Sequence, residues 1–348
     1  MAALRYCSLA SAAHSPARAR EALSWWGEIA LDERDLESVD AKIWARAHAT
    51  LANALLDTPF LMRAPALALA LAHYEAALGV YTSDEFPRDW AQTQIHMGTV
   101  QRTLAGECAA EAKEQCLKAA IERYRAALRV ATPQSAPREW AEIHIQLGAA
   151  HRDIVILDSS GSGPFDYLGR AISCYEQAMR LYSESRHPRQ WARIQVEMGE
   201  TYAAAHSGGR VRNLERAIAC FKNAHRVFTE PETPQEWADL NRKMGQAMAE
   251  LPNGDRSENL REALACFVGA LRVFNEANAP ILFAETNLQT GLAWGELAYA
   301  LDDRTAFRNA VNYISTAAQA FDSAGRLGQA VRARELAADI TESLKRTS

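Results

Sequence analysis

Pro87-Arg88-Asp89-Trp90-Ala91 is the stretch that decides the fold, because the same pattern returns along most of the chain. Later copies begin at Pro137, Pro188 and Pro234, and a weakened copy begins at Pro280. Consecutive copies are separated by between 234 − 188 = 46 and 188 − 137 = 51 residues. A period of this size predicts structural repeats that stack on one another.

Each repeat is predicted to contain two helices. Proline suits the first turn of a helix, where no N–H bond is lost, so the prolines are expected to begin the first helix of each repeat. A glycine recurs eight residues after the tryptophan, as Gly98 follows Trp90. The second helix carries Ala-Ile-x-x-aromatic-x-x-Ala, with Tyr124 as one of the aromatic residues. Glycine inside a helix costs about 1 kcal/mol relative to alanine, so its recurrence needs a compensating reason. We expect that the missing side chain lets the ring of the second helix pack closely against the first helix.

Composition narrows the class of protein. The 348 residues are 48% hydrophobic and carry a net charge of −5, so no overall basic field attracts nucleic acid or an anionic membrane. No apolar run reaches about 18 residues, which predicts that nothing spans a membrane. The stretch from Met1 to Ala13 matches the pattern of a signal peptide only weakly, so we expect a cytoplasmic protein.

The six cysteines do not form a disulfide framework. Cys174, Cys220 and Cys266 occupy equivalent positions in consecutive repeats, roughly 10 Å apart and too distant for a bond. They are expected to be buried, reduced thiols. Cys108 and Cys116 lie in a connecting segment without a second pair to complete a zinc site. We therefore expect no metal.

The repeats resemble the tetratricopeptide repeat (TPR) family. Its first helix has a Leu-Gly pair, here Leu147-Gly148, and its second helix has the Ala, aromatic, Ala triplet. The segment Asn213-Leu214-Glu215-Arg216-Ala217-Ile218 is similar to a longer bacterial variant that often accompanies caspase-like protease, signalling or defence modules. The resemblance implies an all-α fold, an α-solenoid of stacked helix-turn-helix repeats, and a binding scaffold.

Three parts of the chain are expected. Residues 1–40 are predicted to form an N-terminal leading helix or cap. Residues 41–325 are predicted to form about six TPR-like repeats, and residues 326–348 a C-terminal capping helix. The capping helix would close the end of the stack with its polar side.

The resemblance also implies a partner-binding surface, because the first helices line the concave face in this family. The family's positions fall here on both apolar and charged residues, a mixture suited to a peptide that carries acidic and aliphatic side chains. The resulting candidates are Gln92, Ile95, Arg102, Glu142, Ile145, Arg152, Arg193, Val196, Glu200 and Arg242. The Lys and Asn pattern that clamps a terminal carboxylate in some such domains is missing.

No catalytic motif was found. The glycine-rich connections lack the Gly-Lys-Ser/Thr of a phosphate loop, and Ser159 and Ser162 lack a nucleophile setting. We therefore predict no catalytic residue, cofactor or metal. The leading hypothesis is a non-enzymatic scaffold or adaptor that binds a protein or peptide and whose effector is encoded separately. The alternatives are a regulator that responds to a ligand or signal peptide, and an enzyme with an unrecognised site.

Overall fold

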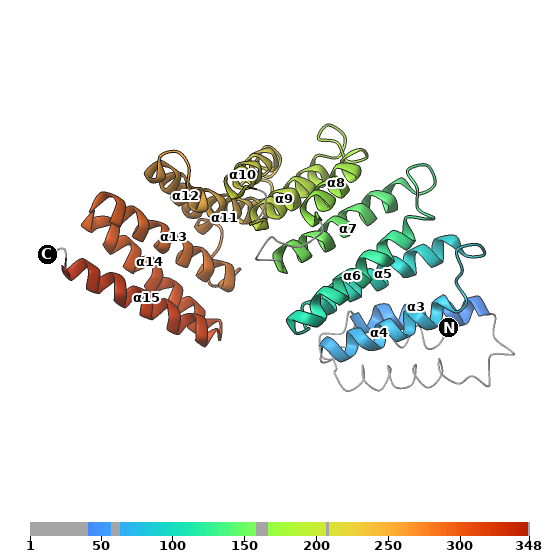
Figure 1. Cartoon of the computed structure of the whole chain (residues 1–348). Helices are drawn as coiled ribbons and strands as arrows, with labels where there is room; N and C mark the ends of the chain where they lie inside the picture. The colour runs from blue at the N-terminus through green and yellow to red at the C-terminus, as the bar shows by residue number, and fades with distance from the viewer. Residues whose placement is uncertain (1–40, 57–62, 158–165, 207–208, 347–348) are drawn as a thin grey trace. The chain divides into compact units, whose positions relative to one another are not determined.

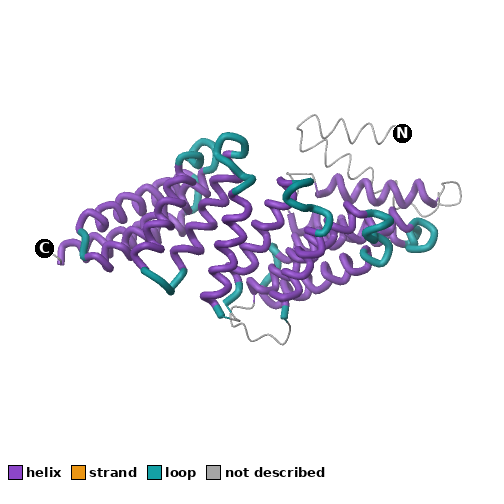
Figure 2. The backbone as a smooth tube through the Cα atoms, turned by 90° about the horizontal axis from the view of Figure 1, so that it is seen from above, coloured by secondary structure: helices purple, strands orange, loops and turns teal. Residues whose placement is uncertain are grey.

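The structure is a computed structural model that describes residues 41–56, 63–157, 166–206 and 209–346 (Figure 1). Within these ranges the chain forms helices and no strand (Figure 2). The leading helix predicted for residues 1–40 lies outside the described residues. The helices are α3 (Ala41–Leu56), α4 (Arg63–Leu78), α5 (Pro87–Ala105), α6 (Ala110–Ala127), α7 (Pro137–Leu157), α8 (Tyr167–Met179), α9 (Pro188–Ala204), α10 (Arg210–His225), α11 (Pro234–Glu250), α12 (Arg256–Leu271), α13 (Pro280–Leu301), α14 (Arg304–Ser323) and α15 (Leu327–Arg346).

The chain divides into two compact units. Unit 1 contains α3 to α7 and nearly all of α8, and unit 2 contains α9 to α15. Helices that follow one another pack as pairs, α3 on α4 and α5 on α6 in unit 1, and α9 on α10, α11 on α12 and α13 on α14 in unit 2. This is the predicted all-α architecture of helix-turn-helix repeats.

The repeated proline begins the first helix of each pair, as predicted. Pro87, Pro137, Pro188, Pro234 and Pro280 are the first residues of α5, α7, α9, α11 and α13. The residue before the proline is kept out of helical geometry by the proline ring, and Phe86 accordingly has φ −129° and ψ 57°. The proline therefore sets where each first helix starts.

The predicted contact between glycine and a bulky side chain is present in five pairs. A Cβ added at Gly98 would lie 2.8 Å from the Tyr124 ring, and one at Gly148 would lie 2.7 Å from the Tyr175 ring. The same relation joins Gly199 to Phe221, Gly245 to Phe267 and Gly291 to Ile314. These five bulky side chains are almost completely buried. The glycine thus lets the two helices of a pair approach until the large side chain is enclosed.

Two buried histidines make the stability sensitive to acid. His73 and His151 are 4% and 2% exposed. Burial lowers the pKa of His73 to about 4, with a further contribution from His48, whose Nδ1 lies 3.0 Å from Nδ1 of His73. Burial also lowers the pKa of His151 to about 4, helped by the charges of Arg125 and Arg170. Both imidazoles are therefore held neutral in the folded chain.

The free energy of unfolding is expected to fall as the pH drops from 6.5 towards 4. In this window the unfolded chain takes up protons at His73 and His151, whereas the folded chain does not. From pH 7.5 to 5.0 the loss is about 2 kcal/mol for each histidine, measured by urea unfolding at each pH. His206→Gln is the control, since His206 is exposed, and its slope should match that of the unmodified chain. A flat profile down to pH 5 would contradict the argument.

Candidate binding surface

The first helices of consecutive repeats lie against one another. In unit 1 α5 contacts α7, and in unit 2 α11 contacts both α9 and α13. The most extensive packing between repeats joins the second helix of one repeat to the first helix of the next, α6 to α7 in unit 1, and α10 to α11 and α12 to α13 in unit 2. The family resemblance puts the binding surface on the first helices.

A cavity of about 500 Å³ in unit 1 lies where α5 and α7 begin. Two of the predicted residues, Gln92 and Ile95, line it. Ile95 is half-buried, and Ala91 and Ala131 are buried, so part of the wall is apolar. The remaining lining residues come from the start of α5, from the turn between α6 and α7 and from the start of α7: Pro87, Arg88, Val130, Ser135, Ala136, Pro137, Arg138 and Glu139.

Two exposed arginines stand at this cavity. Arg88 and Arg138 belong to the repeated proline motif, and both line the cavity. Neither is in an ion pair with another described residue, although the Glu139 carboxylate is also part of the lining. Gln92 is engaged instead, because its Nε2 lies 2.6 Å from Nε2 of His96. The cavity therefore combines an apolar wall with two cations available to an anionic group.

The arginines predicted on the C-terminal halves of α5 and α7 are partly neutralised. An Arg102 Nη1 lies 3.8 Å from the Asp153 carboxylate, and the Arg152 Nε lies 3.5 Å from the same side chain. Glu142 is exposed and accepts a hydrogen bond from Gln146 at 2.8 Å, and Ile145 is half-buried. The structure thus brings Arg102 and Arg152 together around Asp153, which the sequence analysis did not single out.

In unit 2 the predicted charges Glu200 and Arg242 pair with residues outside the predicted set. Lys243 on α11 forms ion pairs with Glu200 on α9 and, at 2.7 Å, with Asp239. Arg242 also pairs with Asp239 at 2.7 Å. Burial alone would raise the pKa of Asp239, but the charges of Lys243 and Arg242 outweigh burial and lower it. Burial alone would lower the pKa of Lys243, but the charges of Glu200 and Asp239 outweigh burial and raise it.

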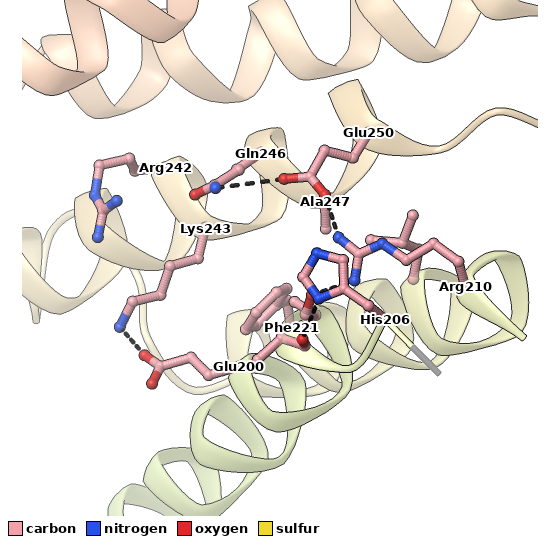
Figure 3. Close-up of a pocket in the computed structure, with 12 residues that line it drawn as sticks. Glu200, His206, Arg210, Phe221, Arg242, Lys243, Gln246, Ala247 and Glu250 are labelled. Atoms are coloured by element: carbon pink, nitrogen blue, oxygen red, sulfur yellow. Dashed lines mark hydrogen bonds and ion pairs between the residues drawn. The ribbon is translucent and has the colours of Figure 1, made fainter. Parts of the chain in front are cut away.

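Glu200, Arg242 and Lys243 also line a second cavity, of about 460 Å³, within unit 2. Figure 3 shows Lys243 reaching towards Glu200 on one side and Arg210 towards Glu250 on the other. Arg210 also donates to the Ala203 and Ala205 carbonyl oxygens. Leu214 and Phe221 provide apolar lining. The polar groups of this cavity are satisfied mainly by the chain itself.

The remaining predicted residues, Arg193 and Val196, lie on α9, the first exposed and the second half-buried. The residues missed at these surfaces include Arg88, Arg138, Asp153 and Lys243. Arg88 and Arg138 carried a signal, because each directly follows the proline of its repeat. Lys243 and Asp153 lie next to Arg242 and Arg152, one position outside the set that the family resemblance supplied.

The described residues show two further properties. No three His, Cys, Asp or Glu side chains among them gather as a metal site would require. None of the described helices combines the length and the apolar character needed to cross a membrane.

Comparison with known proteins gives both a family and a fold. The family model described as "Soluble NSF attachment protein, SNAP" matches residues 105–278, half of the chain. The solved structure of apo RapI is 13% identical, with a TM-score of 0.54, covering 98% of this chain and 84% of that one. The C-terminal part of a TPR repeat-containing protein from Cytophaga hutchinsonii is 12% identical, with a TM-score of 0.52, covering 87% of this chain and 93% of that one. At these identities the likeness shows the fold alone. No curated protein matches significantly.

Proposed function

This chain belongs to the soluble NSF attachment protein (SNAP) family, and on that premise we propose that it is a non-enzymatic scaffold that binds a segment of another protein along its first helices. The family is named for attachment to a partner, NSF, and not for a reaction. The proposed setting is bacterial signalling or defence, because the repeats resemble the long bacterial variant. The effector is then a separate protein.

The observation that carries the proposal is the unit 1 cavity at the starts of α5 and α7. Its volume of about 500 Å³ accommodates a large side chain of an extended segment. Ile95 and Val130 contribute apolar lining, and Arg88 and Arg138 are positioned for a neighbouring carboxylate. In such sites a buried aliphatic group supplies most of the affinity, and a carboxylate paired with arginine fixes the orientation. The occupant is thus a segment in which acidic and aliphatic residues alternate.

The second candidate function is a regulator that closes around a small ligand, and the unit 2 cavity is the feature that favours it. Its volume of about 460 Å³ suits a small molecule. A polar ligand there would have to displace existing ion pairs, such as Arg210 with Glu250. The unit 1 cavity requires no such exchange, so segment binding is the preferred function.

Binding should depend on the two exposed arginines. We expect a short fluorescein-labelled peptide of alternating leucine and glutamate to bind, and the double variant Arg88→Glu, Arg138→Glu to bind it about 10-fold more weakly. The reversal removes two exposed charge contacts, each worth about 0.2–1 kcal/mol, and adds repulsion. Fluorescence anisotropy measures the affinity.

Two controls belong to this experiment. The matched variant is Arg308→Glu, an exposed arginine on α14 in unit 2, which should bind as the unmodified chain does. The control peptide carries lysine in place of glutamate and should not bind. Equal affinity of the double variant and the unmodified chain would remove the unit 1 cavity as the binding site.

A further inference from the structure

The described cysteines fall into two groups with different environments. Cys174, Cys220 and Cys266 occupy the same place in three second helices, and burial raises the pKa of each thiol to about 11. Such thiols carry almost no thiolate near neutral pH and are chemically inert. Cys174 and Cys220 are buried, as predicted for the repeat positions, whereas Cys266 is only half-buried.

Cys108 and Cys116 are brought together by the fold. Their Sγ atoms lie 3.9 Å apart, although the residues are eight positions apart in the sequence. Cys108 belongs to the turn between α5 and α6, and Cys116 lies in the second turn of α6. The turn must therefore run back along α6. Both side chains are half-buried, so reagents can approach them from solvent.

The surroundings allow these sulfurs to come closer. Cys108 precedes the first residue of α6 and lies outside the hydrogen bonds of the helix interior, and its backbone N–H donates only one long hydrogen bond, of 3.4 Å, to the Ala105 carbonyl oxygen. A disulfide needs the sulfurs to approach to about 2.05 Å, which side-chain rotation and a small shift of such a turn can provide. By contrast, the next residue after Cys116, Leu117, is buried in the core and fixes that side of the pair. One sulfur is thus anchored and the other is adjustable.

We propose that Cys108 and Cys116 form a reversible oxidative modification site, closing an intramolecular disulfide by exchange with a small-molecule disulfide such as oxidised glutathione. The Cys108 thiolate attacks one sulfur of the small disulfide, whose S–S bond breaks and releases the first small thiol. The Cys116 thiolate then attacks the Cys108 sulfur and releases the second. The two protons leave the cysteines and end on the two released thiols, so one disulfide is reduced as another forms.

This order of attack follows from the position of the two thiols. Burial raises the pKa of Cys116, as does its contact with the Cys108 sulfur. Cys108 lies on the turn before α6, where an external disulfide can approach it, whereas Cys116 lies inside the helix beside the buried Leu117 and can attack a mixed disulfide held beside it. Cys108 on the turn is therefore the entry point, and Cys116 is the resolving thiol.

The modification is separate from the proposed segment binding. The cysteine pair lies beyond the C-terminal end of α5, whereas the unit 1 cavity lies at the N-terminal end of that helix. The new bond would join the α5–α6 turn to α6. Detection of the bond itself does not depend on any partner, so it can fail or succeed independently of the function proposed above.

Peptide mapping of the full chain tests the proposal. The protein is incubated with oxidised glutathione, alkylated, and digested with trypsin without reduction. Cleavage after Lys113 separates the two cysteines, so the disulfide is read directly as peptide 103–113 joined to peptide 114–118. We expect this joined peptide to be the main form of both cysteines, and Cys174, Cys220 and Cys266 to remain unmodified.

The variant Cys116→Ser separates the two chemical steps. It should yield no joined peptide and should instead accumulate glutathione on Cys108, because the resolving thiol is absent. Addition of a reducing thiol should return the unmodified chain to its original form. The proposal is overturned if Cys108 and Cys116 stay as unreactive as Cys174, or if the unmodified chain stops at the glutathione adduct of Cys108.

Discussion

Gly291→Ala should lower the melting temperature, and Gly295→Ala, four residues later in the same helix, should raise it. A Cβ at Gly291 would clash with Ile314 and would lie 3.0 Å from both the Ala310 carbonyl oxygen and the Ile314 backbone nitrogen. Backbone atoms cannot rotate away, so helices α13 and α14 would have to separate. Overpacking of this kind costs about 1–3 kcal/mol.

Gly295 is the matched control because it is also buried and helical. An added Cβ there would lie 3.6 Å from Ile340 and 3.9 Å from Ala310, which are ordinary contacts. Alanine is about 1 kcal/mol better than glycine inside a helix, so this variant should gain stability. We expect a fall of roughly 4–8 °C for the first variant and a rise of roughly 2–4 °C for the second. Circular dichroism melting measures both, and equal shifts would refute close approach as the reason for the repeated glycine.

The repeated features of the fold were predictable because each repeat presents the same physical requirement. Proline recurs where a first helix starts, and glycine recurs opposite a bulky side chain, so five copies reinforced each prediction. Gly291 shows how far this extends, since its partner Ile314 is not aromatic and still fills the same space. Stacked repeats therefore need the same kinds of residue at equivalent positions, and these recur periodically in the sequence.

Features that occur once were not predictable in the same way. The contact between Cys108 and Cys116 depends on the path of one turn, which has no counterpart in the other repeats. The pairing of Arg102 with Asp153 joins two helices whose relative register is set by packing. The family's binding positions selected Arg102 and Arg152 as cations available to a partner, but these positions do not include the neighbouring Asp153 carboxylate.

Lys243→Met should destabilise unit 2 by about 2–3 kcal/mol, because it leaves Glu200 and Asp239 without their shared cation. Removal of one partner from a buried ion pair costs about 3–5 kcal/mol, and the estimate is reduced because the Lys243 side chain is 21% exposed. Lys222→Met is the control, since Lys222 is exposed on α10, and it should change stability by less than about 0.5 kcal/mol. Urea unfolding at neutral pH measures both variants.

A second substitution identifies the cause of the loss. Adding Glu200→Gln to Lys243→Met removes one uncompensated carboxylate and should restore about 1 kcal/mol. The acid side of the profile should also change. Asp239, with its lowered pKa, contributes stability above pH 3.8 that is lost as the pH falls through its folded value. Without Lys243 this contribution shrinks, so the variant should lose less stability on acidification.

The result also decides whether Glu200 is available to a partner. If Lys243→Met is destabilising and Glu200→Gln relieves it, this predicted partner-binding residue serves mainly to hold α9 against α11. A partner would then have to break the ion pair to reach it, at a cost that the unit 1 cavity does not impose. If Lys243→Met leaves stability unchanged, the charges are available to a partner, and the binding surface must include the first helices of unit 2.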